Sequence, residues 1–415
     1  MAPMHPIPVF AINLKKRPER KAHTIAEFTG RDEFQLQVVE AIEETNGRMG
    51  LWKTIRQVVS HMKAMDMAYG IICEDDHYFT DDYSTALLLD TIQQCQLLQA
   101  DALLGGVSWF QGFVPVTENL CWTERFTGLQ FCVVFHKFFD QILDAVFSER
   151  DAADLKFWEL SEKIFLLHPF ISKQKEFGYS DTTERNNEAG VVTRHFDRIS
   201  AEIASIASIS AYYQDIVKTQ PSGRQPSFEL PVLTIAALSA TAAMEEYPAY
   251  IRNLNTIGAA APLSALHQYI QQAVQLELDF FIIARERFSL LTTSELAYLM
   301  TNIRGAMEDG ADCLCIGCDD FGQSFPITSH RFWVSSFSRS SLLVIFPSFY
   351  PTMLQIAENI TPENLDYLLS KQTIYKMLLA PMSPGKEDRK GAARIQVIQR
   401  AYDQLVVFKE KISHR

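Results

Sequence analysis

The feature that most constrains the fold of this chain is an internal repeat between its two halves. Phe281–Ala284 resembles Gly70–Cys73, and from there the halves match without a gap at a constant offset, 211 positions between Ile72 and Ile283. The matched positions that carry identical residues include Asp101 and Asp312, Gly106 and Gly317, Pro115 and Pro326, Thr117 and Thr328, Trp122 and Trp333, Phe126 and Phe337, Phe135 and Phe346, and Leu143 and Leu354. Agreement at Trp, Pro and Phe over such a span indicates one structural unit that is present twice.

Within each half, short apolar runs typical of buried strands alternate with stretches of helical periodicity, a pattern that predicts an α/β fold. In the first half we expect strands at 8–14, 34–40, 70–73, 102–107 and 129–135, and helices at 18–28, 52–69, 85–98, 138–147, 154–165 and 192–217. The predicted organisation is a first domain over residues 1–190, a helix and linker over 191–228, a second domain over 229–385 and a C-terminal helix over 386–415. Each domain is expected to be a Rossmann-like, mostly parallel sheet flanked by helices.

The composition is that of a globular protein, with 47% hydrophobic residues, 21% charged residues and a formal net charge of −12. This acidic balance argues against nucleic acid or an anionic membrane surface as the main partner, because both are negatively charged. No stretch approaches the roughly 18 apolar residues of a membrane span, and no secretory signal is evident, so we expect a cytoplasmic protein. The seven cysteines do not follow a zinc-binding spacing and are expected to be reduced and mostly buried.

The main candidate site is the sequence Ile71-Ile72-Cys73-Glu74-Asp75-Asp76, in which an apolar run passes directly into three acidic residues. Such a run is typical of a buried strand, and ligands of α/β sheets bind at the carboxyl ends of strands. Mg²⁺ and Mn²⁺ prefer oxygen ligands such as carboxylates. In many sites the same ion is bound by protein carboxylates and by phosphates of the substrate. Glu74, Asp75 and Asp76 are therefore candidate ligands of Mn²⁺ or Mg²⁺ beside a diphosphate. The alternative is a charged, solvated loop.

The second half does not keep this acidic cluster. At the same offset its residues are Arg285, Glu286 and Arg287, and two guanidinium groups would repel a divalent cation. The rival acidic pair, Asp319-Asp320, aligns with Ser108-Trp109 instead. Because the halves share packing residues and differ where chemistry would take place, the contrast favours a functional site in the first half.

A basic turn follows the first predicted strand. Ile12-Asn13-Leu14 is followed by Lys15-Lys16-Arg17-Pro18-Glu19-Arg20, and Pro18 suits the first turn of a helix. At the carboxyl end of a strand this turn suits an anionic ligand, although a solvated helix start is the alternative.

Together these motifs resemble bacterial glycosyltransferases of the GT-A fold, most closely the lipopolysaccharide-type family 25. The resemblance covers about residues 7 to 185 and rests on Ile12-Asn13-Leu14 with Arg17 and Arg20, on Ser60-His61, on Glu74-Asp75-Asp76 and on Gly128. It implies a nucleotide-sugar donor, expected to be UDP-linked, and a divalent metal on the DxD-like acidic triplet. The donor-binding residues that it implies are Ile12, Asn13, Leu14, Arg17, Arg20, His61, Glu74, Asp75, Gly128, Gln130, Gln174 and Ser180.

The resemblance also implies a carboxylate base that deprotonates the acceptor hydroxyl, as an inverting enzyme of this fold requires. Asp154 and Asp181 are the two candidates, and the family tends to carry an acid near the position of Asp154. The alternatives are that Asp154 is only a helix-start residue and that Asp181 orders the nucleotide or caps a helix. The chain departs from the family where Leu129-Gln130-Phe131 stands in place of a strand that commonly carries Tyr.

The sequence therefore predicts a metal-dependent glycosyltransferase that moves a sugar from a nucleotide sugar to a glycan, lipopolysaccharide or other hydroxyl acceptor. The second half would be a non-catalytic pseudo-transferase that serves as a structural partner, an acceptor-binding module or the surface of a homodimer. One alternative is a non-catalytic scaffold built from two degenerate transferase domains. Another is a nucleotidyltransferase, although the first strand is not followed by a glycine-rich phosphate loop.

Overall fold

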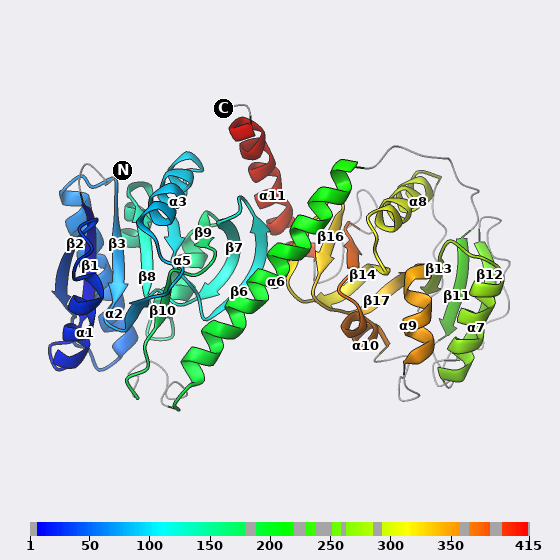
Figure 1. The fold of residues 1–415 in the computed structure, drawn as a ribbon, viewed down its shortest axis with the longest axis horizontal. Coiled ribbons are helices and arrows are strands. Elements are labelled where there is room, and N and C mark those ends of the chain that lie inside the picture. Colours follow the sequence, from blue (N-terminus) through cyan, green and yellow to red (C-terminus); the bar gives the residue numbers. More distant parts are fainter. Residues whose placement is uncertain are drawn as a thin grey trace. The chain divides into compact units, whose positions relative to one another are not determined.

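The computed structural model describes residues 6–178, 188–219, 230–236, 251–258, 263–284, 293–356, 365–381 and 392–413. The chain divides into two compact units, one made of Met1–Ile209 with Gln404–Arg415 and the other of Ser210–Asp403. Each unit contains an eight-stranded sheet with helices packed on it, so the predicted α/β class is confirmed (Figure 1). Two helices, α6 (Val191–Thr219) and α11 (Ala392–Ser413), contribute residues to both units.

The first sheet has the strand order β2-β1-β3-β8-β5-β9-β7-β6. Its strands are β1 (Ile7–Asn13), β2 (Phe34–Glu40), β3 (Tyr69–Glu74), β5 (Ala102–Leu104), β6 (Trp109–Pro115), β7 (Leu120–Thr127), β8 (Phe131–Phe135) and β9 (Ile164–Leu167). All of them except β7 and β8 run in the same direction. A separate antiparallel pair, β4 (His77–Phe79) with β10 (Ser172–Gln174), continues the chain beyond the acidic end of β3.

The helices of the first unit are α1 (Pro18–Phe28), α2 (Gly47–Ala64), α3 (Thr85–Leu97), α4 (Phe139–Asp144) and α5 (Ala153–Leu160). Helix α2 begins at Asn46, whose side chain accepts a hydrogen bond from the backbone N–H of Arg48. Its buried face packs against β1 and β3 and consists of apolar residues at helical spacing: Trp52, Ile55, Val58, Val59 and Met62. This packing fixes the strands whose ends form the candidate site.

The helix predicted over residues 154–165 is shorter in the structure than the sequence suggested. We expected a helix from Asp154 to Phe165, but α5 ends at Leu160 and Ile164–Leu167 is strand β9, which pairs in parallel with β5. All four residues of β9 are buried. A short apolar run that is buried on every side has no periodicity that distinguishes a strand from a helix, which is the reason for the error.

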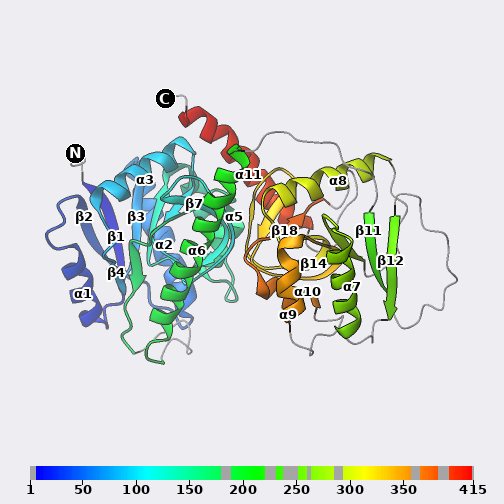
Figure 2. The ribbon, with the colours of Figure 1, turned by 45° about the vertical axis from the view of Figure 1, so that its right-hand side comes forward.

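The second sheet has the order β12-β11-β13-β17-β14-β18-β16-β15, which matches the first sheet strand for strand. Its strands are β11 (Leu230–Ala236), β12 (Ile251–Gly258), β13 (Phe281–Ala284), β14 (Cys313–Phe321), β15 (Ser324–Pro326), β16 (Arg331–Val334), β17 (Phe337–Ile345) and β18 (Lys376–Leu379). The parallel pair of β11 and β12 is visible in both ribbon views (Figure 2). The helices of this unit are α7 (Leu263–Gln275), α8 (Thr293–Glu308), α9 (Tyr350–Gln355) and α10 (Leu365–Gln372).

The repeated residues also make equivalent contacts. The indole N–H of Trp122 donates to the carbonyl of Glu162, and that of Trp333 donates to the carbonyl of Ile374, both at 2.7 Å. The sequence repeat therefore corresponds to repeated structure. The predicted linker residues 220–227, and Arg285, Glu286 and Arg287, lie outside the described residues.

All seven cysteines are buried, as expected, and none of them lies in a disulfide. Among the described residues, no helix combines the length and the apolar character that crossing a bilayer requires.

Candidate functional site

An open cavity lies where three parallel strands of the first sheet end. β1 pairs with both β2 and β3, so that Asn13 lies beside Glu40 and Ile12 beside Glu74. The cavity encloses about 1100 Å³ including its open mouth. Its walls are formed by residues that follow β1, β2 and β3 and by the segment Gln174–Phe177.

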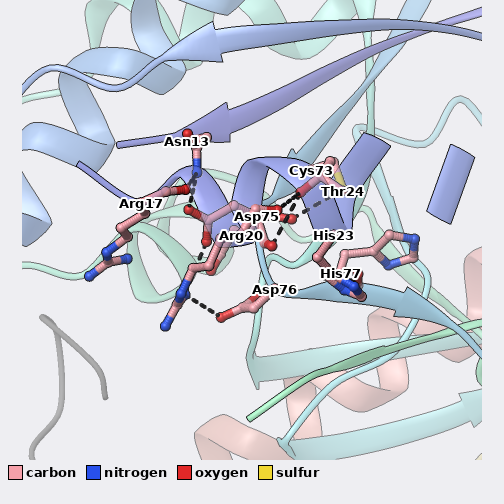
Figure 3. Close-up of polar contacts among 10 residues, drawn as sticks. Asn13, Arg17, Arg20, His23, Thr24, Cys73, Asp75, Asp76 and His77 are labelled. Carbon is pink, nitrogen blue, oxygen red and sulfur yellow. Dashed lines mark hydrogen bonds and ion pairs between the residues drawn. The ribbon is translucent and has the colours of Figure 1, made fainter. Parts of the chain in front are cut away.

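Asp75 is held between the first strand and the basic turn (Figure 3). Its Oδ2 accepts a 2.9 Å hydrogen bond from Asn13 Nδ2, and its Oδ1 accepts a 3.0 Å bond from Arg20 Nη1. The hydroxyl of Thr24 donates to the Asp75 carbonyl at 3.2 Å. The residue is 6% exposed. Both carboxylate oxygens are therefore engaged, and Asp75 fixes the acidic loop to α1.

Asp76 faces the same cavity with one oxygen available. Its Oδ2 lies 3.3 Å from Arg20 Nη1, whereas its buried Oδ1 has no hydrogen-bond partner among the described residues. Burial and the charge of Asp75 raise the pKa of Asp76 to about 7, against the opposing effect of Arg20 and Arg17. The backbone N–H of Lys175 donates to the Asp76 carbonyl at 2.7 Å, which ties the loop to the opposite wall.

Glu74 occupies the last position of β3 and lines both this cavity and a second one beside it. Burial raises its pKa well above the ordinary value, and the charges of Asp76, Asp75 and Asp154 raise it further. Within the described part of the chain its carboxylate makes no hydrogen bond or ion pair. The side chain is therefore available to a ligand in either cavity.

The second cavity encloses about 950 Å³ including its open mouth and shares Leu51, Glu74 and Gln174 with the first. Its other polar lining includes Arg48, Ser108, Thr127 and Asp154. Asp154 accepts hydrogen bonds from two backbone amides, that of Gly128 to Oδ2 at 3.2 Å and that of Leu155 to Oδ1 at 2.9 Å. Burial raises the pKa of Asp154, and these two amides oppose the shift.

The structure brings most of the predicted donor-binding residues to this region. Ile12, Leu14, Arg17, Arg20 and Gln174 line the first cavity, Gly128 lines the second, and Asn13 acts through Asp75. Ser180 and Asp181, the latter a candidate base, lie outside the described residues.

Two predicted residues have other positions. Gln130 is fully buried and donates to the Gly106 carbonyl at 2.9 Å, so that it shapes the wall behind Gly128. His61 is exposed in the last turn of α2, where its ring packs edge-on against Phe10, and it lines neither of the two cavities.

The donor-binding residues implied by the resemblance did not include Lys16 and Lys175, which line the first cavity, or Arg48, which lines the second. Lys16 belongs to the basic turn, and its neighbours Arg17 and Arg20 could have pointed to it. Nothing in the local sequence distinguishes Arg48 from other helix-start residues.

The acidic residues fit a divalent cation that is shared with a ligand. In the described ranges, no group of three or more His, Cys, Asp or Glu side chains is placed to hold a metal ion. Mg²⁺ at a nucleotide site, however, commonly takes only one or two protein carboxylates and completes its shell with phosphates and water. Asp76 suits this role through its buried, unpartnered Oδ1. Asp75 suits it less well, since both of its oxygens accept N–H donors.

Comparison with known proteins does not assign this chain to a family. No family model matches the sequence, and no curated protein matches it. Among solved structures, A197 from STIV is 12% identical, and the match covers 42% of this chain and 87% of that one with a TM-score of 0.28. An apo UDP-glucose pyrophosphorylase is 8% identical over 47% of this chain and 81% of that one, with a TM-score of 0.28.

A third solved structure, mannose-1-phosphate geranyltransferase from Thermus thermophilus, is 8% identical over 72% of this chain and 100% of that one, with a TM-score of 0.26. At such scores these similarities bear on neither ligand nor reaction. The resemblance to family 25 stays a prediction, and the function is inferred from the site's own residues.

Proposed function

We propose that the first unit is a glycosyltransferase that uses a nucleotide-sugar donor together with a divalent cation. The observation that carries this proposal is the pair of adjoining cavities that meet at Glu74. A group-transfer enzyme must hold two substrates so that their reacting atoms meet, and adjoining cavities provide this arrangement. One cavity suits an anionic donor and the other a neutral, polar acceptor.

The first cavity has the chemistry that a nucleoside diphosphate requires. Lys16, Arg17, Arg20 and Lys175 supply positive charge for the phosphates, and Ile12, Leu14 and Ile42 supply apolar surface for the nucleoside. Asp76, with Glu74 beside it, would hold Mn²⁺ or Mg²⁺. When bound, that ion neutralises charge on the departing diphosphate. Asp75 acts as a positioning residue because it holds Asn13 and Arg20 in place.

The second cavity is proposed to bind the acceptor, a glycan or another molecule with a free hydroxyl. Ser108, Thr127 and Gln174 offer hydrogen-bonding groups that suit hydroxyls, and Arg48 is the cation of this cavity among the described residues. Asp154 stabilises the wall of this cavity, because its carboxylate accepts a hydrogen bond from the backbone N–H of Gly128.

We further propose that the two units arose by duplication and that the second unit is not catalytic. Asp366 occupies the place in α10 that Asp154 occupies in α5, but it is 2% exposed. Its Oδ2 accepts hydrogen bonds from both the backbone N–H and the hydroxyl of Ser340, at 2.6 and 2.8 Å. In the second unit the carboxylate that corresponds to Asp154 is therefore engaged in hydrogen bonds within the protein.

Calorimetric titration of UDP and then of a panel of nucleotide sugars, with and without Mn²⁺, tests this function. We expect metal-dependent binding by the wild type and a loss of at least about tenfold in affinity for Asp76→Ala, because the proposed metal ligand is removed. The matched control is Asp140→Ala, which removes an exposed carboxylate of α4 that pairs with Lys63.

Two outcomes would favour the alternatives. If no nucleotide sugar of the panel binds to the wild type, the first unit is better described as a non-catalytic scaffold. If the protein releases pyrophosphate and not nucleoside diphosphate during turnover, it is a nucleotidyltransferase.

A further inference from the structure

We infer that the acceptor is a carbohydrate chain, and that the outer face of strands β6 and β7 binds the sugar units beyond the one that reacts. This inference rests on the proposed transferase function and narrows its acceptor from any hydroxyl compound to an oligosaccharide. Three side chains of the two strands and one of α5 form this face, which we call the rim strip: Trp109, Gln111, Arg125 and Trp158.

The rim strip begins at the wall of the second cavity. Ser108 and Thr127 line that cavity, and their hydroxyl oxygens lie 3.0 Å apart. Trp109 follows Ser108 and is paired with Thr127 in the antiparallel ladder of β6 and β7. Residues paired in this way carry their side chains on the same face of a sheet, with Cβ atoms about 5 Å apart. The indole of Trp109 is therefore a neighbour of the cavity.

The strip continues along the two strands and onto α5. Gln111 is paired with Arg125, two positions further along each strand, and alternate residues of a strand share a face. The guanidinium of Arg125 lies over the Trp158 ring, with 4.8 Å between its central carbon and the ring centroid. Arg125 also pairs with Glu124 at 3.7 Å, and 46% of its side chain is exposed. With five N–H donors, it can still bind a ligand.

Trp109 presents its indole to solvent. The residue is 39% exposed, whereas its neighbour Phe110 is fully buried. With respect to the residues that the structure describes, the indole makes no hydrogen bond and no contact with another ring. Single exposed apolar side chains are common, but Trp gains more than other side chains from contact with a partner and is enriched at binding surfaces. Beside a polar cavity, it is placed to contact a ligand that extends out of that cavity.

The second unit repeats these strands but not the rim strip. Asp320 takes the position of Trp109 in the repeat and in the equivalent pair of strands. The next residue is a buried phenylalanine in both units, Phe110 in the first and Phe321 in the second. The other strand positions of the strip also differ: Gln111 and Arg125 correspond to Gly322 and Ser336. The exposed indole is therefore no requirement of the fold, and it occurs in the unit that we propose to be catalytic.

The chemistry of the strip fits a sugar. A pyranose ring has a face of C–H groups, which packs against the flat, electron-rich surface of an indole. Its hydroxyls pair with planar polar groups such as the Gln111 amide and the Arg125 guanidinium. A lipid chain or an apolar peptide would cover these polar groups without offering them hydrogen bonds, which is costly. The strip therefore favours an oligosaccharide over an apolar partner.

In the proposed complex, the sugar unit with the attacking hydroxyl occupies the second cavity, and the next units pass Ser108 and Thr127 and stack on Trp109. A single sugar ring in the cavity does not reach the strip. Affinity should therefore depend on Trp109 for an oligosaccharide and not for a monosaccharide.

The test applies the full chain to an array of immobilised oligosaccharides that differ in composition and length. The tightest of them, and the methyl glycoside of its terminal sugar, are then titrated calorimetrically. We expect Trp109→Ala to lower the oligosaccharide affinity by about tenfold, and Trp109→Tyr, which keeps an aromatic face, by no more than about threefold. The methyl glycoside should bind equally to all variants. The matched control is Tyr367→Ala, which removes an exposed aromatic side chain of α10 in the second unit.

Turnover connects the strip with the transfer. With a nucleotide sugar that the calorimetric panel shows to bind, the oligosaccharide should accelerate the release of nucleoside diphosphate. Trp109→Ala should raise the KM for the oligosaccharide by about tenfold and change kcat by less than about threefold, because the lost contact lies away from the reacting atoms.

The possible outcomes are distinct. If no oligosaccharide of the array binds to the wild type, or if Trp109→Ala binds it as well as Tyr367→Ala does, the inference is overturned. An oligosaccharide that binds through Trp109 without accelerating release overturns the acceptor role. Self-association that depends on Trp109, measured by sedimentation velocity, would make the strip an interface between copies of the chain and overturns the inference as well. Failure of the proposed function is seen separately, because no nucleotide sugar then binds to the wild type, whatever the array shows.

Discussion

The amide nitrogen of the Asn13 side chain donates a 2.9 Å hydrogen bond to Oδ2 of Asp75, across 62 positions of sequence. This bond joins the end of β1 to the loop after β3. Both residues are buried, at 3% and 6% exposure. The acidic loop is therefore a fixed part of the sheet edge, and its geometry depends on a residue of the opening strand.

Asn13→Ala removes the donor and leaves a buried carboxylate oxygen without its partner. We expect the free energy of unfolding to fall by about 1–3 kcal/mol and donor affinity to fall with it, because the acidic loop is no longer fixed. Urea denaturation and calorimetry measure the two effects. The matched control is Asn119→Ala, whose side chain donates to the His168 carbonyl at 3.0 Å away from the cavity. That variant should lose stability and keep donor affinity, and equal donor affinity in both variants would contradict the prediction.

Arg20→Met leaves Asp75 and Asp76 without the guanidinium that faces both of them at 3.0 and 3.3 Å. Removal of one partner from a buried ion pair typically costs about 3–5 kcal/mol, and we expect a loss of that size in chemical denaturation. Arg20→Lys should lose less stability, because it keeps the charge but not the planar group that reaches two carboxylates. A loss below about 1 kcal/mol for Arg20→Met would show that the ion pair does not hold the loop.

Asp76→Asn should stabilise the protein in alkaline solution when no metal or donor is present. Folding raises the pKa of Asp76 from 3.8 to about 7, so the folded state binds this proton more tightly than the unfolded chain. The contribution is present below pH 4 and is lost as the pH rises through 7, because the carboxylate must then ionise while buried. The Asn variant avoids this loss.

Melting curves at acidic and alkaline pH check this prediction. We expect the melting temperature of Asp76→Asn to exceed that of the wild type near pH 8, by about 2–4 °C for each kcal/mol, and the difference to shrink near pH 4. Metal-dependent donor binding should be lost in the same variant. A lower melting temperature than the wild type at about pH 8 would contradict the assigned electrostatics.

Gly128→Ala should damage the second cavity more than the first. Gly128 has φ +113°, and a Cβ at this position would lie 2.9 Å from Gln130 Oε1. We expect the strain to lower the free energy of unfolding by about 1–3 kcal/mol and to displace the Gly128 N–H, which donates a hydrogen bond to Asp154. Turnover should therefore fall while donor affinity is kept. The control is Gly30→Ala, which has φ +79° but no atom within 4 Å of the added Cβ. Thermal melts and turnover assays should show a clearly smaller effect for Gly30→Ala.

Much of the architecture could be predicted from the sequence because the relevant signals are local. The apolar run into Glu74-Asp75-Asp76 identified both the strand β3 and the acidic edge of the sheet. The match of Trp122 with Trp333 predicted a repeated unit, and both indoles make the same hydrogen bond. Strand β9 was missed because Ile164–Leu167 is buried on every side and has no polar face to reveal its period.

What the sequence by itself determined is the α/β class, the repeat and the residues near the site, since periodicity and residue type are properties of neighbouring positions. Only the tertiary structure decided how each carboxylate of the acidic cluster is engaged. Asp75, Asp76 and Glu74 are adjacent in sequence and chemically alike, but Asn13 and Arg20 occupy both oxygens of Asp75, Arg20 approaches one oxygen of Asp76, and Glu74 lines both cavities. The physical reason is that hydrogen-bond partners come from distant strands and helices, and their approach is set by the packing of the whole sheet.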